Sequence, residues 1–207
     1  MLWIGPMSYD SDRTEREFIK SIVVEVKRVL EYIGGNSNQR GQTEATQIPQ
    51  PDVNRQRAVF NVRQLKISGS HNARYWTFES ISEPPNEVAI EVAKMKRCYY
   101  LEVCGKFDTK ELIYGTRYEV VFVVKVEETM TRWDNPATAQ LMVPDNGLQE
   151  REFQFIDLVR NEWIDIQAGV FDAQLHKEKI AFYLYQHQSN IRMTGLLVKG
   201  AIIRPME

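Results

Sequence analysis

Residues 58–207 contain a series of short apolar runs, each of strand length, with Gly, Pro and Asn residues in the turns between them. Many runs are rich in aromatic and β-branched side chains, which favour strands. The runs are VFNVRQLKI (59–67), RYWTFESI (74–81), CYYLEVCGKF (98–107), TRYEVVFVVKVEE (116–128), ATAQLMV (137–143), REFQFIDL (151–158), EWIDIQAGVF (162–171), KIAFYLYQ (179–186) and MTGLLVKGAIIRP (193–205). This pattern predicts an all-β sandwich or barrel. Strands that alternate with helices would instead indicate a doubly wound sheet, and the sequence lacks that pattern.

A helix is expected before the strands. Thr14 and Glu17 fit a capping box, in which each side chain satisfies a backbone donor of the first turn. Apolar residues then recur at helical spacing, namely Phe18, Ile19, Ile22, Val23, Val26, Val29, Leu30 and Ile33. Gly34 and Gly35 are expected to end the helix, because glycine is common just after a helix C-terminus.

The chain therefore divides into three parts. Residues 1–33 form an N-terminal helical segment, and residues 34–57 are polar, rich in Gln and Asn, and typical of a flexible linker. Residues 58–207 form the β-domain.

Charge and hydropathy exclude several functions. The chain has 26 basic and 28 acidic residues and a formal net charge of −2, so it lacks the basic excess of a nucleic-acid-binding protein. Neither does it contain about 20 consecutive apolar residues that would span a bilayer. Its first residues are not those of a signal peptide, so we expect a cytoplasmic protein. Cys98 and Cys104, if both lie on one strand, are about 20 Å apart and cannot form a disulfide.

Five ordered sequence blocks resemble one family of plant proteins. They are RYWTF (74–78), LEVCGKFDTK (101–110), YEVVFVVKV (118–126), EWIDIQAGVF (162–171) and TGLLVKGAIIRP (194–205). The order and content of these blocks are similar to the phloem protein 2 lectins, also called Nictaba-like lectins. The resemblance implies a jelly-roll-like antiparallel β-sandwich that binds N-acetylglucosamine (GlcNAc) oligomers or N-glycan cores. It also implies a defence-related protein of the cytosol, nucleus or phloem sap.

The N-terminal segment EREFIKSIVVEVKRVL (15–30) resembles, more weakly, the last helix of plant TIR domains. The segment is too short to contain the catalytic glutamate of a TIR NAD-cleaving site. We therefore expect a helix without enzymatic activity.

The candidate sugar site lies beside the turn at 69–73. Oligosaccharide binding needs an aromatic surface for the apolar face of the sugar and a few polar partners. The candidate residues are Trp76, Tyr75, Phe78, Asn72, Gln186 and Arg192. Large aromatic residues are usually buried, so Trp76 alone would be read as a core residue. The resemblance instead places Trp76 in the sugar site, as an exposed stacking platform.

Two departures from the family pattern weaken the expected stacking. Gly69 occupies a position at which the family often has tryptophan, and a second such tryptophan is missing near Arg192. Each loss removes about 0.5–1.5 kcal/mol of stacking. The alternative function is therefore a protein-interaction module that kept the lectin fold but lost or weakened sugar binding.

An enzyme is disfavoured. His71, His176 and His187 are scattered, and no nucleophile, metal-ligand or acid–base spacing emerges, so we expect no catalytic residue, metal or cofactor. Glu102 and Asp108 are better explained as structural residues than as a glycosidase pair. Trp163 is expected in the core, where large aromatic residues are usually found. The expected partners are GlcNAc oligomers or glycoproteins and a second copy of the chain in a homodimer, with no nucleic acid and no membrane insertion.

Overall fold

The computed structural model describes residues 57–83, 88–131, 133, 135–144, 147–174, 179–187 and 192–206. These residues belong to one unit of the chain, which spans residues 48–207. The expected helix and nearly all of the expected linker lie outside the described residues. Within the described part, strands and short 3₁₀ turns are the regular elements, and none is a helix long and apolar enough to cross a membrane.

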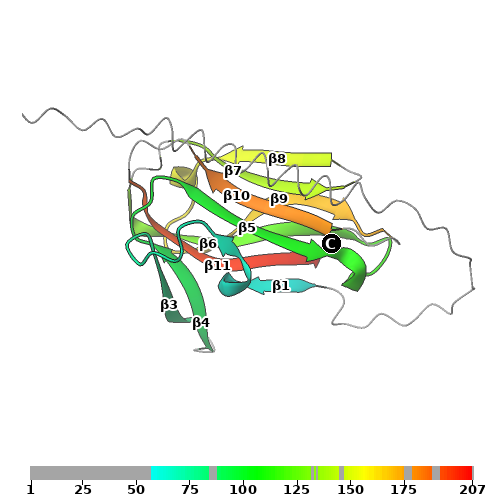
Figure 1. Cartoon of the computed structure of the whole chain (residues 1–207), viewed down its shortest axis with the longest axis horizontal. Coiled ribbons are helices and arrows are strands. Elements are labelled where there is room, and N and C mark those ends of the chain that lie inside the picture. Colours follow the sequence, from blue (N-terminus) through cyan, green and yellow to red (C-terminus); the bar gives the residue numbers. More distant parts are fainter. Residues whose placement is uncertain are drawn as a thin grey trace, which may run out of the picture. The chain divides into compact units, whose positions relative to one another are not determined.

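Two antiparallel sheets pack against each other, which confirms the predicted β-sandwich (Figure 1). The first sheet has the order β3-β4-β11-β6-β9, and β1 also pairs with β11. Its strands are β1 (Ala58–Asn61), β3 (Trp76–Glu83), β4 (Val88–Met95), β6 (Arg117–Thr131), β9 (Trp163–Asp172) and β11 (Thr194–Pro205). The second sheet has the order β2-β5-β10-β7-β8. Its strands are β2 (Lys66–Ile67), β5 (Leu101–Asp108), β7 (Ala137–Val143), β8 (Gly147–Phe153) and β10 (Lys179–Gln186).

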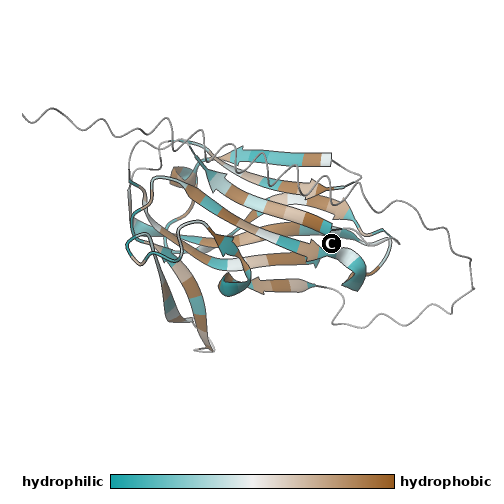
Figure 2. Cartoon of the chain, viewed as in Figure 1, coloured by the Kyte–Doolittle hydropathy of each residue, from teal (hydrophilic) through white to brown (hydrophobic). Residues whose placement is uncertain are grey.

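The core lies between the sheets and follows from the two-residue period of the strands. In β7, buried residues alternate with half-buried ones along the whole strand. Hydrophobic (brown) and hydrophilic (teal) stretches therefore occur along the same strand in Figure 2. Phe122 of the first sheet and Phe182 of the second meet edge to face, with ring centroids 5.6 Å apart. Both side chains are fully buried, and each contributes about 1.5–3 kcal/mol of apolar burial.

The first predicted strand, 59–67, is divided between the two sheets. β1 pairs with β11, and β2 pairs with β5. The 3₁₀ turn Val62–Gln64 separates β1 from β2, because the Asn61 side chain accepts hydrogen bonds from two backbone N–H groups of this turn. The Gln64 side chain in turn accepts one from the Asn61 backbone at 2.9 Å. A capping pair thus replaces the continuous strand.

The cysteines do not share a strand, contrary to expectation. Cys104 lies in β5, whereas Cys98 lies in the loop before it and forms an isolated antiparallel bridge with Met193. Neither forms a disulfide. Burial raises the pKa of the Cys98 thiol to about 12.

Candidate functional site

Three segments that are far apart in sequence meet at one end of the sandwich. They are the loop after β2 (68–75), the loop after β4 (96–100) and the residues that lead into β11 (192–193). The Tyr75 carbonyl joins the first two, because it accepts a hydrogen bond from the Lys96 backbone at 2.8 Å and one from the Cys98 thiol at 3.6 Å. Cys98 and Met193 join the third segment by two reciprocal backbone hydrogen bonds of 3.0 and 2.6 Å.

These segments form a pocket of about 660 Å³. Its lining residues are Arg74, Tyr75, Lys96, Arg97, Tyr99 and Arg192. The two tyrosines are 39% and 44% exposed, so their rings are available to a ligand. Arg192 donates a hydrogen bond from Nε to the Tyr99 hydroxyl at 2.7 Å, and its guanidinium lies 5.4 Å from the centre of that ring. The pocket combines aromatic surfaces with hydrogen-bond donors.

Gly69 shapes the loop beside this pocket. Its φ of +76° lies in the left-handed region that favours glycine. A Cβ at this position would lie 3.3 Å from the Tyr75 ring and 3.9 Å from the Tyr100 hydroxyl. Tyr100 is itself 38% exposed. The family often has a tryptophan at position 69. In this chain Gly69 lies instead beside the side chains of Tyr75 and Tyr100.

The exposure predicted for Trp76 is wrong. Only 1% of the residue is accessible, and its indole donates a hydrogen bond to the Ser68 carbonyl at 3.2 Å. Trp76 opens β3 opposite Met95 of β4, and both side chains belong to the core. An indole in this position cannot stack on a sugar from solvent; it fixes the loop that carries Gly69 and Tyr75.

The other predicted residues occupy different environments. Phe78 packs against the core, with the Arg63 guanidinium 3.6 Å from its ring centre, and lies outside the pocket lining. Asn72 accepts a hydrogen bond from the Arg74 backbone at 3.0 Å and so shapes the loop. Gln186 is only 2% exposed and donates to the Asn135 carbonyl at 3.0 Å.

Of the six predicted site residues, only Tyr75 and Arg192 line the pocket. The sequence reasoning missed its other four residues. Three of these lie in or next to KMKRCYY (94–100), where basic and tyrosine residues are interleaved, which is a signal that was available in the sequence. The fourth, Arg74, directly precedes Tyr75.

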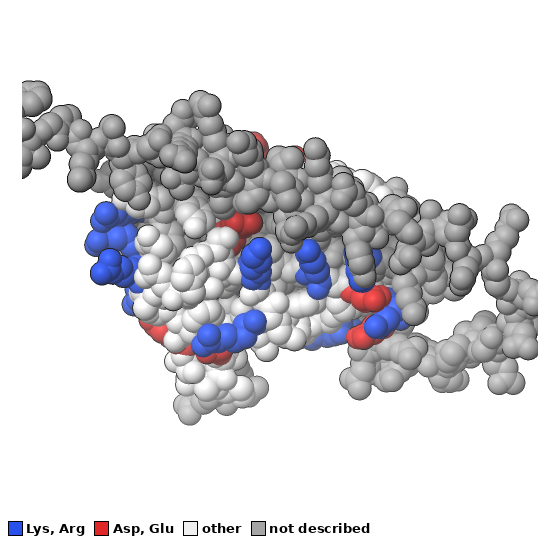
Figure 3. Space-filling model, in the orientation of Figure 1, with Lys and Arg blue, Asp and Glu red and all other residues white. Residues whose placement is uncertain are grey.

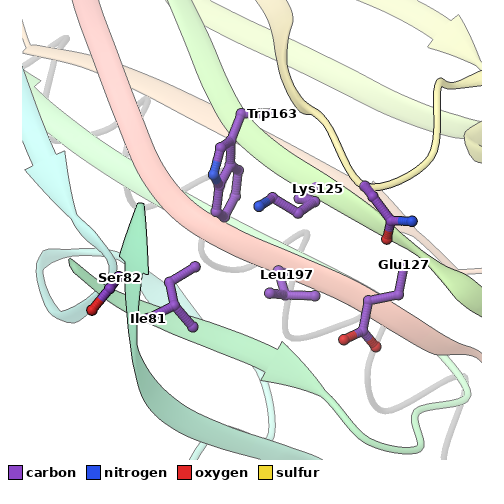
Figure 4. Close-up of a pocket in the computed structure, with 7 residues that line it drawn as sticks. Ile81, Ser82, Lys125, Glu127, Trp163 and Leu197 are labelled. Atoms are coloured by element: carbon purple, nitrogen blue, oxygen red, sulfur yellow. The ribbon is translucent and has the colours of Figure 1, made fainter. Parts of the chain in front are cut away.

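A second pocket, of about 510 Å³, lies on the outer face of the first sheet (Figure 4). Trp163 stands at its side, while Ile81, Leu197 and Lys125 come from β3, β11 and β6 of the same sheet. The expectation that Trp163 is a core residue is wrong, because it is half-buried on this outer face. The ammonium groups of Lys125 and Lys199 lie 4.4 and 5.2 Å from its ring centre. Two cations thus lie over the one aromatic ring of this pocket. The first pocket, called the tyrosine pocket below, offers two exposed rings, Tyr75 and Tyr99, with one cation, Arg192, beside Tyr99, and is the better candidate.

The two carboxylates considered for catalysis have structural contacts. Glu102 accepts a hydrogen bond from the Ser68 hydroxyl at 2.6 Å, and Asp108 accepts one from the Lys110 backbone at 3.2 Å. Six residues along one strand separate them, or about 20 Å, whereas glycosidase carboxylates lie about 5–9.5 Å apart. Among the described residues, no group of three potential metal-ligating side chains comes together.

Comparison with known proteins identifies several relatives. The sequence profile of the phloem protein 2 family matches residues 55–205. The chain is 33% identical to Protein PHLOEM PROTEIN 2-LIKE A8 of Arabidopsis thaliana, with 95% of this chain and 55% of that protein covered. It is 36% identical to Protein PHLOEM PROTEIN 2-LIKE A1 of the same plant, with coverage of 70% and 60%. It thus spans little more than half the length of these two relatives.

A lectin of Luffa acutangula is 33% identical, with 72% of this chain and 70% of that protein covered. Among solved structures, a family 35 carbohydrate binding module from Clostridium thermocellum is similar at 9% identity, with a TM-score of 0.42. This likeness covers 71% of the present chain and 96% of the module.

Proposed function

Since the chain belongs to the phloem protein 2 family, we propose that its β-sandwich binds carbohydrate as a lectin, without catalysing a reaction. The Luffa lectin, similar along 70% of its length, supports this proposal. The observation that carries it is the pocket in which Tyr75 and Tyr99 expose their rings beside Arg192. We further propose a cytoplasmic location, as expected from the sequence.

The chemistry of the pocket suits a sugar. A tyrosine ring stacks against the apolar face of a pyranose, while its hydroxyl forms hydrogen bonds at the rim. The Arg192 guanidinium presents several donors in one plane, which suit hydroxyl and acetamido oxygens. A single sugar ring in this surface pocket would make too few contacts to offset the free-energy cost of association. We therefore propose GlcNAc oligomers, rather than free GlcNAc, as the neutral ligands.

Calorimetric titration of the full chain with chitotriose and with GlcNAc tests this function. We expect measurable binding of chitotriose, much weaker binding of GlcNAc, and no cleavage of the trisaccharide on prolonged incubation. Tyr99→Ala should reduce chitotriose affinity at least about tenfold, since it removes both a stacking surface and the hydroxyl that Arg192 contacts.

Tyr114→Ala provides the matched control. Tyr114 is 58% exposed, but it does not line the pocket, and it follows the C-terminal end of β5, whereas the pocket residues Lys96, Arg97 and Tyr99 lie just before the N-terminal end of that strand. Its removal should leave the affinity unchanged. Equal losses in both variants would place the site elsewhere. Absence of binding to any glycan on an array would leave the interaction module as the better explanation.

A further inference from the structure

The tyrosine pocket concentrates positive charge in a chain whose net charge is −2. Four of its six lining residues are basic, namely Arg74, Lys96, Arg97 and Arg192, and none is acidic. The space-filling view shows a group of basic side chains at the end of the sandwich where the loops after β2 and β4 lie (Figure 3). This concentration is local, because the chain as a whole has slightly more acidic than basic residues.

Three of these cations have no acidic partner in the described part of the chain. Lys96 lies 3.3 Å from Glu79, but within the described residues no carboxylate is within ion-pair distance of Arg74, Arg97 or Arg192. Arg204, on the first sheet, shows the contrast, because it contacts Glu119 at 2.7 Å and Asp165 at 2.8 Å.

Uncompensated like charges around one pocket repel each other, and an anion bound between them relieves that repulsion.

From this geometry we infer that the pocket recognises an acidic saccharide, in which the sugar ring carries a carboxylate, as in a hexuronate. The inference rests on the proposed lectin function and specifies its ligand class. Guanidinium groups are planar forks that match a carboxylate with two parallel hydrogen bonds. Tyr75 and Tyr99 supply the aromatic surface that a sugar ring requires and that a free anion does not need.

The same features disfavour a nucleic acid. A single-stranded nucleic acid is held by a basic groove that follows the backbone over several nucleotides. Here the basic residues line one pocket, and Lys96 at its side is already paired with Glu79. The pocket volume of about 660 Å³ falls in the usual range for small ligands, about 300–1,000 Å³. A compact ligand with one or a few charges therefore fits best.

The test compares three trisaccharides with the full chain by calorimetry: trigalacturonate, its methyl ester and chitotriose. The ester keeps the sugar rings of the acid and removes the charge. We expect trigalacturonate to bind at least about tenfold more tightly than the ester at low salt. This preference should shrink as salt is raised, because screening weakens charge interactions at exposed sites.

Arg97→Gln should reduce the ratio of acid to ester affinity towards one. Arg117→Gln, which removes an exposed charge at the start of β6 outside the pocket, should leave the ratio unchanged. Thermal melts of both variants check that each is folded. If the ratio of acid to ester affinity stayed high in Arg97→Gln, the proposal that the sugar carboxylate binds in this pocket would be overturned.

The outcomes separate the inference from the function on which it rests. Preference for the acid supports the inference, whether or not chitotriose also binds. Equal binding of acid and ester would overturn the inference and leave the lectin function standing. If none of the three saccharides bound and a glycan array showed no binding, the inference and the lectin function would both be overturned. Inorganic phosphate or oligouridylate that displaces trigalacturonate at equal concentration would overturn it in favour of a general anion site.

Discussion

Trp76 provides a direct test of which residues hold the fold and which contact sugar. Truncation to alanine removes a side chain that is 1% exposed and should cost about 3–5 kcal/mol. For a domain of this size, each kcal/mol lowers the melting temperature by about 2–4 °C, so Trp76→Ala should melt about 6–20 °C lower. Trp76→Phe keeps most of the apolar volume but removes the indole donor to the Ser68 carbonyl. It should therefore cost about 1–3 kcal/mol.

Trp133→Phe is the matched control for the loss of a buried indole. Trp133 is also 1% exposed, and its indole donates to the Thr194 carbonyl at 2.9 Å. It does not line the tyrosine pocket. The two phenylalanine variants should therefore be destabilised to a similar extent in thermal melts.

Binding measured well below the melting temperature completes the test. Chitotriose affinity should fall much less in Trp76→Phe than in Tyr99→Ala, because the buried ring does not contact the sugar and acts on the pocket only through the loop that its indole holds. Tyr99→Ala should show the reverse pattern, with little change in melting and a large loss of affinity. If Trp76→Phe melted like the wild type but lost chitotriose, the ring would be a binding surface and the reasoning from burial would be refuted.

Two further changes test the loop and the thiol. Gly69→Ala should cost about 1–2 kcal/mol for its left-handed backbone and also weaken chitotriose binding, because the new Cβ would press on a pocket tyrosine. Gly115→Ala has nearly the same φ, +74°, but meets nothing within 4 Å, so melts and titrations should show the backbone cost without the binding loss. Burial holds the pKa of Cys98 at about 12, above the usual value for an unfolded chain, so the unfolded state loses its proton first. Unfolding free energy should therefore fall between about pH 9 and 12, and this component should be absent in Cys98→Ala; an equal decline in both would contradict it.

The β-sandwich was predictable because the chain contains many apolar runs of strand length, and most of the turns between them contain Gly, Pro or Asn. β7 buries every second residue along its whole length, whereas the centre of β6 buries five consecutive residues, 120–124. The division of 59–67 was not foreseen, although the apolar alternation changes phase within it, from Phe60 and Val62 to Leu65 and Ile67. Asn61 and Gln64, three residues apart, carry the capping signal at this change of phase.

The site was harder to predict because it depends on contacts between distant segments. Tyr75 and Tyr99 come together through hydrogen bonds to the Tyr75 carbonyl, and Arg192 joins them through the isolated bridge between Cys98 and Met193; no local pattern indicates either contact. Sequence reasoning placed Cys98 in a strand with Cys104, which hid the loop in which Tyr99 is exposed.

The error on Trp76 has a different origin. The general rule that large aromatic residues are buried gave the correct environment, and the resemblance to a lectin motif overrode it. A motif match identifies a family, but it does not distinguish the ring that contacts a ligand from the ring that holds the contacting loop. In this chain the two roles fall to adjacent residues, Tyr75 at the pocket and Trp76 in the core beneath the loop.

The same distinction changes the meaning of Gly69. A glycine at a position that often carries tryptophan suggests a weakened site, but here the surrounding side chains are those of Tyr75 and Tyr100. A bulky residue at 69 would press against the Tyr75 ring and would bear the cost of the left-handed backbone. Tyrosine brings a hydroxyl as well as a ring, and the neighbouring arginines bring charge. Glycine at 69 is thus compatible with a site that relies less on stacking area and more on polar and ionic recognition, as a carboxylated sugar requires.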